Sequence, residues 1–409
     1  MKYIYSFILF SFLFSQTSTL SLTGFGEYIN THDASSVGIG DSKYFNGYSD
    51  RINFSSCSSY WKSSFSNLIM SIDVHNYSLE SDNLVSNNFK MLSFSFPVGN
   101  NKAVSLGMNP LLRSNITVSE LDYVFIPAQN SPTGNPLAYN TDYSFKGGVS
   151  EFFVLYSSKL TEKVSFGFKW SKLFGSSEYK YLLNLYNVSF DSSENISYDF
   201  NNIESFINNQ TYSSDKYNIE FRCDFKKYEF ILGYSQSNPL NINFTPYFDT
   251  LGNLNTENYY INDNLYERDF GLKYKLNENF GFIYENHFYN SFNSYDFLNI
   301  LNNSVNNIKS NHLGIYSIDY KKPNSKINRS ILRLGVYQKV YDLNSYEIQD
   351  SGLTLGLGIN YFNTKNFIDI SFKFGNKNFT NNIYNDENYY QIILSIVSGE
   401  KWFVNEREK

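Results

Sequence analysis

Apolar and polar side chains alternate along much of the chain after residue 64. Successive side chains of a β-strand point to opposite faces of a sheet, so strict alternation predicts strands with one apolar and one polar face. The stretch FVLYSSKLTEKVSFGFKW, residues 153–170, contains two such runs, which only Lys159 to Glu162 separate. This stretch therefore predicts two neighbouring strands joined by a tight turn.

Segments of this kind recur along the chain. Fourteen of them lie near residues 65–77, 87–97, 102–117, 139–159, 163–175, 211–225, 228–238, 265–276, 279–290, 309–321, 329–341, 350–361, 366–376 and 387–398. Short connections such as LTEK, KKY and LNEN alternate with long ones near 118–138, 176–210 and 239–264. Short turns at one end and long loops at the other are typical of an outer-membrane β-barrel. With an even number of strands, both termini are expected at the short-turn end, in the periplasm.

The alternation also predicts which side of the barrel each residue occupies. In segment 366–376, Ile370 and Phe372 share one face, whereas Asp369 and Lys373 share the other. Backbone groups in lipid must be hydrogen-bonded within the protein, so the sheet is expected to close on itself, with its apolar face toward lipid. Segment 309–321 fits this pattern least well, because its apolar residues fall on both faces: Leu313, Ile315, Tyr316 and Ile318.

The polar faces carry charges of both signs that we expect to point into the lumen: Asp73, His75, Lys169, Glu220, Arg222, Asp224, Lys273, Glu285, His287, Arg333, Asp369 and Lys373. A ring that selects ions would show one dominant sign. The mixture predicts instead a self-neutralising network along the wall.

Composition narrows the class of membrane protein. Mean hydropathy is −0.38, and no run of 18 apolar residues follows the first 20 residues, which excludes a helical membrane protein. The 19% of aromatic residues suits strands. The start, MKYIYSFILFSFLFSQTSTLS, has one cation, an apolar stretch and small polar residues, so residues 1–20 are predicted to be a signal peptide cleaved between Ser15 and Ser21. The barrel is expected to span residues 65–409.

The segment between these parts, residues 21–64, is rich in Gly, Ser and Asp and has little strand periodicity. We expect it to be a hatch or plug in the lumen, with Asp33 capping a short helix from Ala34 to Gly38. Its Cys57 should lie inside the barrel or in the periplasm, whereas parity places Cys223 toward lipid. A disulfide is not expected, because it would have to cross the wall.

Two irregularities mark the third and fourth strand segments. Pro110, after Asn109, cannot donate a hydrogen bond to a sheet, so the strand needs a bulge or a break there. Gly147 and Gly148 fall inside the next segment at a similar height. They indicate either an ordinary bulge that sets barrel curvature, or a region where pairing between the two strands is lost and an apolar molecule could leave sideways into the bilayer.

Nothing in the sequence favours catalysis. The four His form no H-E-x-x-H motif, and no G-x-S-x-G motif is present. His287 with Glu285, and His75 with Asp73, make conceivable acid–base pairs, but no nucleophile accompanies them. We expect neither enzyme activity nor a cofactor, a metal site or a nucleic-acid partner.

At these residues the chain resembles the FadL/TodX family of outer-membrane transporters and the related PorV/PorQ proteins of type IX secretion. The family hatch opens with a D-A-x-x-x-G-x-G-like run, matched here by DASSVGIGD with Asp33, Gly38, Gly40 and Asp41. The kinked third strand of the transporters is matched by Asn109-Pro110. The chain departs from the family in lacking the Asn-Pro-Ala triplet of the hatch and a terminal Phe.

The resemblance implies passive uptake of hydrophobic compounds, such as fatty acids or aromatic hydrocarbons, by a bacterial protein surrounded by outer-membrane lipid. It implies capture by aromatic-rich loops, including LDYVFIP at 121–127, and release through a lateral opening at Asn109, Pro110, Gly147 and Gly148. An alternative is a secretion component that binds secretion-system proteins through its loops. A third is a purely structural surface protein.

Overall fold

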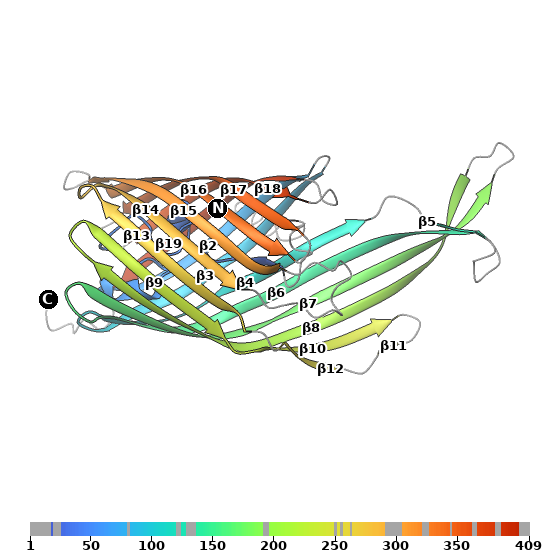
Figure 1. Cartoon of the computed structure of the whole chain (residues 1–409), viewed down its shortest axis with the longest axis horizontal. Coiled ribbons are helices and arrows are strands. Elements are labelled where there is room, and N and C mark those ends of the chain that lie inside the picture. Colours follow the sequence, from blue (N-terminus) through green and yellow to red (C-terminus); the bar gives the residue numbers. More distant parts are fainter. Residues whose placement is uncertain are drawn as a thin grey trace, which may run out of the picture.

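The computed structural model describes residues 18, 26–79, 82–119, 124–127, 136–190, 196–248, 252–253, 257–261, 264–290, 305–320, 327–343, 346–361, 366–380 and 386–400. Fourteen strands form a closed antiparallel barrel (Figure 1): β2 (Ser66–Leu79), β3 (Asp82–Gly99), β4 (Lys102–Ser119), β6 (Leu137–Lys159), β7 (Val164–Phe190), β8 (Ile196–Asp224), β9 (Tyr228–Ser237), β13 (Tyr266–Lys275), β14 (Phe280–Asn290), β15 (Val305–Tyr320), β16 (Ile327–Leu343), β17 (Glu347–Tyr361), β18 (Asn366–Phe379) and β19 (Glu387–Glu400). Pairing of β19 with β2 closes the ring. The predicted fold is confirmed, and each predicted segment overlaps one barrel strand.

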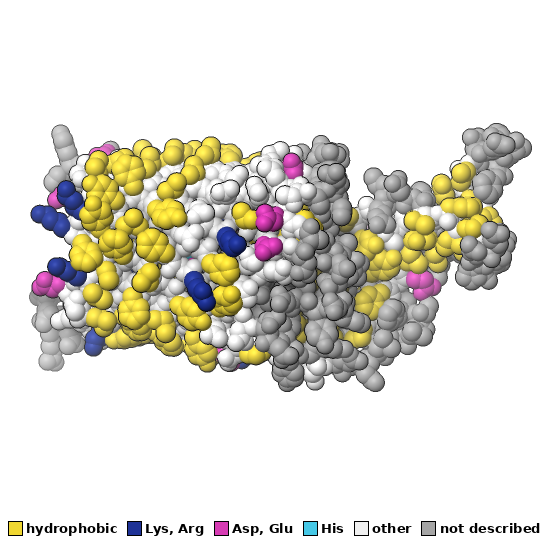
Figure 2. Space-filling view, in the orientation of Figure 1, with side chains coloured by type: hydrophobic (Ala, Val, Ile, Leu, Met, Phe, Trp, Pro, Cys, Tyr) yellow, Lys and Arg dark blue, Asp and Glu magenta, His cyan; other side chains and the backbone are white. Residues whose placement is uncertain are grey.

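Side chains alternate between the outside and the lumen as the pattern predicts. On β2, Leu68 and Met70 are exposed on the outside, whereas Ile69 and Ser71 are buried. Apolar side chains cover much of the outer surface, and Lys and Arg gather at the short-turn end (Figure 2). Backbone closure combined with an apolar exterior is what a membrane-spanning barrel requires. Among the described residues, no helix is long and apolar enough to span a bilayer.

The charges expected in the lumen face inward. Most are buried, including Glu220, Lys273, Glu285 and Asp369, each at most 1% exposed. The mixed pattern of segment 309–321 now has a physical reason. Tyr316 and Ile318 of β15 face inward but pack against apolar residues of the N-terminal segment, among them Tyr48. Both cysteines are free, with Cys57 buried, as predicted.

The connection expected at 176–210 is largely strand, which corrects the sequence prediction. β7 and β8 continue as a long hairpin beyond the barrel, and β10 (Leu240–Phe248) pairs with the other edge of β8 (Figure 1). Side chains in this hairpin are partly exposed on both faces. Only a few of the described side chains are buried, such as Val188 and Asn208, so the hairpin has no continuous buried face that would impose the alternation seen in the other strands.

Short strands complete the sheet: β1 (Glu27–Tyr28), β5 (Val124–Ile126), β11 (Gly252–Asn253) and β12 (Glu257–Ile261). The chain from Gly26 to Ser64, called here the N-terminal segment, also contains helix α2 (Ala34–Val37) and the 3₁₀ helix η2 (Cys57–Lys62). Asp33 caps α2 by accepting a hydrogen bond from the backbone N–H of Ser36 at 3.0 Å, as predicted. The predicted signal peptide lies outside the described residues except for Ser18.

Candidate functional site

The N-terminal segment lies inside the barrel. Its residues bond to inward-facing side chains of strands on opposite sides of the ring: Glu220 of β8, Asp269 of β13, Glu285 of β14, His312 of β15, Arg333 of β16, Thr354 of β17, Asp369 of β18 and Ser395 of β19. A segment with partners all round the wall must lie in the lumen.

Beside this segment the barrel wall parts between β3 and β4. Their pairing runs from Gly99–Lys102 up to Leu92–Met108 and then stops. Above that level, the described part of β3 pairs with β2 alone. The free edge of β4 pairs instead with β1, with Glu27 opposite Arg113 and Tyr28 opposite Leu112. The N-terminal segment thus occupies the place on β4 that a wall strand holds lower down.

β4 leaves the membrane-facing surface at the same level. Four consecutive residues are buried here, namely Asn109, Pro110, Leu111 and Leu112. A wall strand would expose every second side chain to lipid, so this stretch has turned inward. A register shift falls between Pro110 and Leu112. The Asn109-Pro110 irregularity therefore marks an inward bend.

The glycine pair has a different position from the one expected. β4 and β6 stay paired on both sides of the bulge, with Gly148 opposite Arg113 and Gly147 opposite Ser114. Of the two alternatives that the sequence left open, this pairing favours a bulge, because β4 and β6 stay paired here and the wall parts at the other edge of β4. Gly148 has a φ of +140°, and a Cβ there would lie 2.1 Å from the carbonyl oxygen of Leu112. The glycines thus permit a sharp bend beside the parting.

His32 connects the N-terminal segment to the bend. Its Nε2 lies 3.1 Å from Asn109 Nδ2, and the imidazole is buried. Burial lowers the pKa of His32 to about 3, since a charged ring would lose its hydration there. A neutral ring can accept a hydrogen bond from the Asn109 amide. His32 and Asn109 also line a cavity of about 30 Å³ with Leu111 and Glu151.

Ion pairs hold the N-terminal segment on the other side of the lumen. The Asp41 carboxylate lies 2.7 Å from Lys339 Nζ and 2.9 Å from Lys373 Nζ, and all three side chains are nearly buried. Burial alone would raise the pKa of Asp41, but the two lysines outweigh it and hold the pKa well below its usual range. Lys43 lies between Glu267 at 2.7 Å and Asp269 at 2.8 Å.

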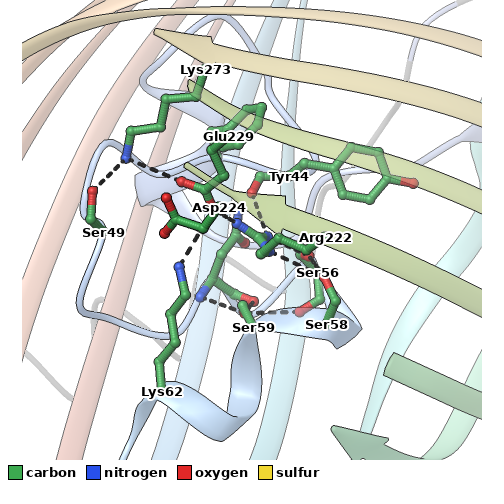
Figure 3. Close-up of polar contacts among 12 residues, drawn as sticks. Tyr44, Ser49, Ser56, Ser58, Ser59, Lys62, Arg222, Asp224, Glu229 and Lys273 are labelled. Carbon is green, nitrogen blue, oxygen red and sulfur yellow. Dashed lines mark hydrogen bonds and ion pairs between the residues drawn. The ribbon is translucent and has the colours of Figure 1, made fainter. Parts of the chain in front are cut away.

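A further group of polar contacts joins η2 and the preceding loop to β8, β9 and β13 (Figure 3). Arg222 pairs with Glu229 and donates to the carbonyl oxygen of Tyr44 at 3.2 Å and to Ser56 at 2.9 Å. Lys273 donates to Ser49 at 3.1 Å. The luminal charges therefore form a mixed-sign network, as predicted, but much of it serves to fix the N-terminal segment.

The glycines of the DASSVGIGD run allow this segment to touch the wall. A Cβ at Gly38 would lie 2.7 Å from the Cα of Gly356 on β17. One at Gly40 would lie 2.5 Å from the carbonyl oxygen of Leu313 on β15, and Gly40 has a φ of +93°. Backbone contact at these distances requires glycine. Gly38, Gly40, Asp33 and Asp41 thus form one anchored unit on the side of the lumen formed by β15–β19.

Sequence analysis missed other residues of the N-terminal segment that hold it in the lumen. Glu27, Tyr28 and Lys43 belong to the site, and nothing in their local sequence marks them. Pro110 was the signal for the bend, but the edge at which the wall parts depends on strand pairing. Among the described residues, no group of three His, Cys, Asp or Glu side chains is placed to hold a metal ion.

Comparison with known proteins supports this architecture. The CymD monoaromatic hydrocarbon channel superposes with a TM-score of 0.54 at 10% identity, covering 92% of this chain and 99% of that one. A FadL homologue from Pseudomonas aeruginosa gives a TM-score of 0.55 at 9% identity, covering 93% and 100%. Identities this low show a shared fold. No curated protein matches the chain in sequence.

These structural matches show that the chain has the barrel fold of FadL-like channels. A model of a protein family, BamG, also matches residues 2–408, which is almost the whole sequence. The chain therefore belongs to the BamG family and has the barrel architecture of FadL-like outer-membrane channels.

Proposed function

We propose that this barrel is a passive channel for hydrophobic compounds, such as long-chain fatty acids or aromatic hydrocarbons. Residues 21–64 act as its hatch, and the parting of β3 and β4 at Asn109 and Pro110 is its lateral opening. The observation that carries the proposal is the inward bend of β4 at Asn109 and Pro110, directly beyond the point where its pairing with β3 ends. CymD, which shares the fold, is named a monoaromatic hydrocarbon channel.

Passage requires the hatch to move. The cavities that border the parting measure about 30 and about 50 Å³, room for a few water molecules but not for a fatty acid. β1 covers the free edge of β4, and the Asp41 ion pairs hold the hatch in place. Displacement of β1 and the loop around His32 would open a route from the lumen to the parting.

In this proposal both termini and the short turns face the periplasm, and ligands enter from the long-loop end. Exposed apolar residues there, including Val124 and Phe125 of the predicted capture loop, would make the first contact. Gly147 and Gly148 would fix the bend beside the opening. Diffusion along this route needs neither catalysis nor a cofactor.

A single substitution can tether the hatch. The Sγ of native Cys57 lies 3.6 Å from the side-chain Oδ1 of Asn218 on β8, so Asn218→Cys would place two thiols side by side. Uptake is measured as oleate reaching albumin trapped inside vesicles whose outer leaflet is lipopolysaccharide. We expect the oxidised N218C protein to lose uptake and the reduced protein to regain it.

The matched control combines N218C with Cys57→Ser, which cannot form the tether and should be insensitive to oxidation. Wild-type vesicles that take up no more oleate than protein-free vesicles would refute the channel. Equal uptake by the oxidised and reduced tether would refute the moving hatch.

A second candidate function is binding of a protein partner at the long-loop end. The β7–β8 hairpin projects beyond the barrel and exposes Ile196, Phe200 and Ile203 (Figure 1). Removal of the hairpin tip should then abolish co-purification of the partner from the native membrane while leaving oleate uptake intact. Loss of uptake without loss of a partner would contradict it.

A further inference from the structure

A second cavity opens at the short-turn end of the barrel, away from the parting. It measures about 430 Å³, within the range of pockets that hold small-molecule ligands. Its walls are formed by the ends of β2, β15, β16, β18 and β19 and by nearby parts of the N-terminal segment.

Positive charge predominates in the lining. Arg51, Lys62 and Arg329 face one carboxylate, Asp50. Asp50 lies 2.9 Å from Arg329, but its side chain is 66% exposed, so water weakens this pair. Lys62 lies 3.5 Å from Glu229, outside the lining. Each cation thus has a carboxylate partner, but Asp369 and Glu229 lie outside the lining, so cationic donors outnumber carboxylates among the residues that a ligand would meet.

Arg51 is the residue that points to a ligand. It is 7% exposed, and its Nη2 donates to Asp369 at 2.8 Å. Its Nε and Nη1 have no hydrogen-bond partner in the part of the chain that the structure describes. A buried charged donor without a partner is costly, and an acceptor that enters the cavity would remove that cost.

Aromatic rings surround this guanidinium. Its carbon lies 3.7 Å from the ring centre of Phe367 and 5.2 Å from that of Tyr48, so cation–π contacts hold the group beside β18. Phe54, Phe65 and Tyr320 also line the cavity. A ligand that meets both features would combine an anionic head with a flat apolar body.

From these contacts we infer that the cavity binds small aryl carboxylates. The carboxylate accepts hydrogen bonds from Arg51 and is attracted by Arg329, and the ring lies against Phe65 and Phe367. The biological meaning rests on one part of the proposed function, the orientation of the barrel: with the short turns facing the periplasm, a site here lies off the lateral route and would hold aromatic acids at the periplasmic end of the barrel. Binding itself can be measured without transport.

The test uses fluorescence of naphthylacetate and of the matched alcohol, naphthylethanol, with the full-length protein in non-ionic detergent. We expect the acid to bind at least roughly tenfold more tightly than the alcohol, since charge-assisted hydrogen bonds carry the difference. Arg51→Gln should weaken binding of the acid about tenfold and leave the alcohol unchanged. Arg268→Gln, which removes a residue exposed on the outer face of β13, is the control and should change neither.

A second variant keeps Arg51 and fills part of the cavity with a larger side chain. Ser64 is exposed at the cavity rim, so Ser64→Trp should fold normally and weaken binding of both ligands. The heat-dependent gel mobility of the barrel checks that each variant is folded. Equal binding of acid and alcohol, or of acid by wild type and R51Q, would overturn the inference. Tighter binding of decanoate or inorganic phosphate than of naphthylacetate would refute the assignment of aryl carboxylates as the ligands of this cavity.

Failure of this site is distinguishable from failure of the channel. A protein that takes up oleate but does not bind naphthylacetate through Arg51 refutes the site and leaves the channel. A protein that binds naphthylacetate through Arg51 but takes up no oleate refutes the channel, and the site stands.

Discussion

Asp41 gives the sharpest test of how the N-terminal segment is held. Asp41→Asn keeps the shape of the side chain and removes its charge. The residue has a φ of +58°, a region that Asn tolerates well, so the substitution adds no backbone strain. The change therefore isolates the two ion pairs with Lys339 and Lys373.

The magnitude follows from burial. The Asp41 side chain is 2% exposed, and those of Lys339 and Lys373 are 10% and 9% exposed. Removal of one partner from a buried ion pair leaves an uncompensated charge and typically costs about 3–5 kcal/mol. The lower figure corresponds to a roughly hundredfold increase in the opening equilibrium of the segment, at about 1.4 kcal/mol per factor of ten.

The assay is amide hydrogen exchange, followed by mass spectrometry, on protein in lipid nanodiscs. Peptides that cover residues 31–46 of D41N should exchange about a hundredfold faster than wild type, while β16 and β17 keep their protection. Asp50→Asn is the matched control. It removes one carboxylate from the same segment, but Asp50 is largely exposed, so the expected change is below about 1 kcal/mol.

Equal exchange rates in D41N and wild type would refute the reasoning that Asp41 anchors the segment. Similar acceleration in D41N and D50N would refute the claim that burial decides the energy. Faster exchange throughout the barrel would show that the ion pairs stabilise the whole fold and do not act on the N-terminal segment alone.

Two further predictions follow from the same region. His32 is neutral in the folded state and has a pKa lowered to about 3 from a usual value near 6.5, so the unfolded or opened segment binds more protons between these values and stability falls as pH falls through that window. The exchange of residues 29–34, divided by the intrinsic exchange rate at each pH, should therefore increase from pH 7 to pH 5, and His32→Gln should remove most of that dependence; an unchanged dependence would contradict it. Gly148→Ala and Gly99→Ala should each destabilise the barrel by about 1–3 kcal/mol in urea unfolding through their positive φ, and Gly148→Ala should cost more, because its Cβ would lie 2.1 Å from the Leu112 carbonyl oxygen whereas Gly99 faces open space. Similar losses in both glycine variants would contradict the claim that close contact with β4 requires glycine at position 148.

The sequence was sufficient for the barrel because lipid and lumen impose a two-residue period on every wall strand. It failed for the β7–β8 hairpin, whose described side chains form no continuous buried face to impose such a period. The N-terminal segment was located from its composition, and Asp33 from its capping position. The contacts of Asp41 with Lys339 and Lys373 join residues about 300 positions apart, and only closure of the barrel brings them together.

For the site, too, the sequence predicted some features and not others. Pro110 marked the bend because proline cannot donate to a sheet. The sequence could not show at which edge of β4 the wall parts, because the strand has backbone donors and acceptors along both of its edges. Gly147 and Gly148 were correctly recognised as irregular, but the structure pairs them with β4 and does not place them at an open edge.

A reversible staple across the parting tests the lateral route most directly. Met91 and Asn109 are the first opposed positions above the last β3–β4 pair, so Met91→Cys with Asn109→Cys would close the parting when oxidised. Leu92→Cys with Met108→Cys, at the last existing pair, is the control. Oleate uptake should be lost in the oxidised first pair, return on reduction and persist throughout in the control. Full uptake through the oxidised first pair would show that ligands do not leave between β3 and β4.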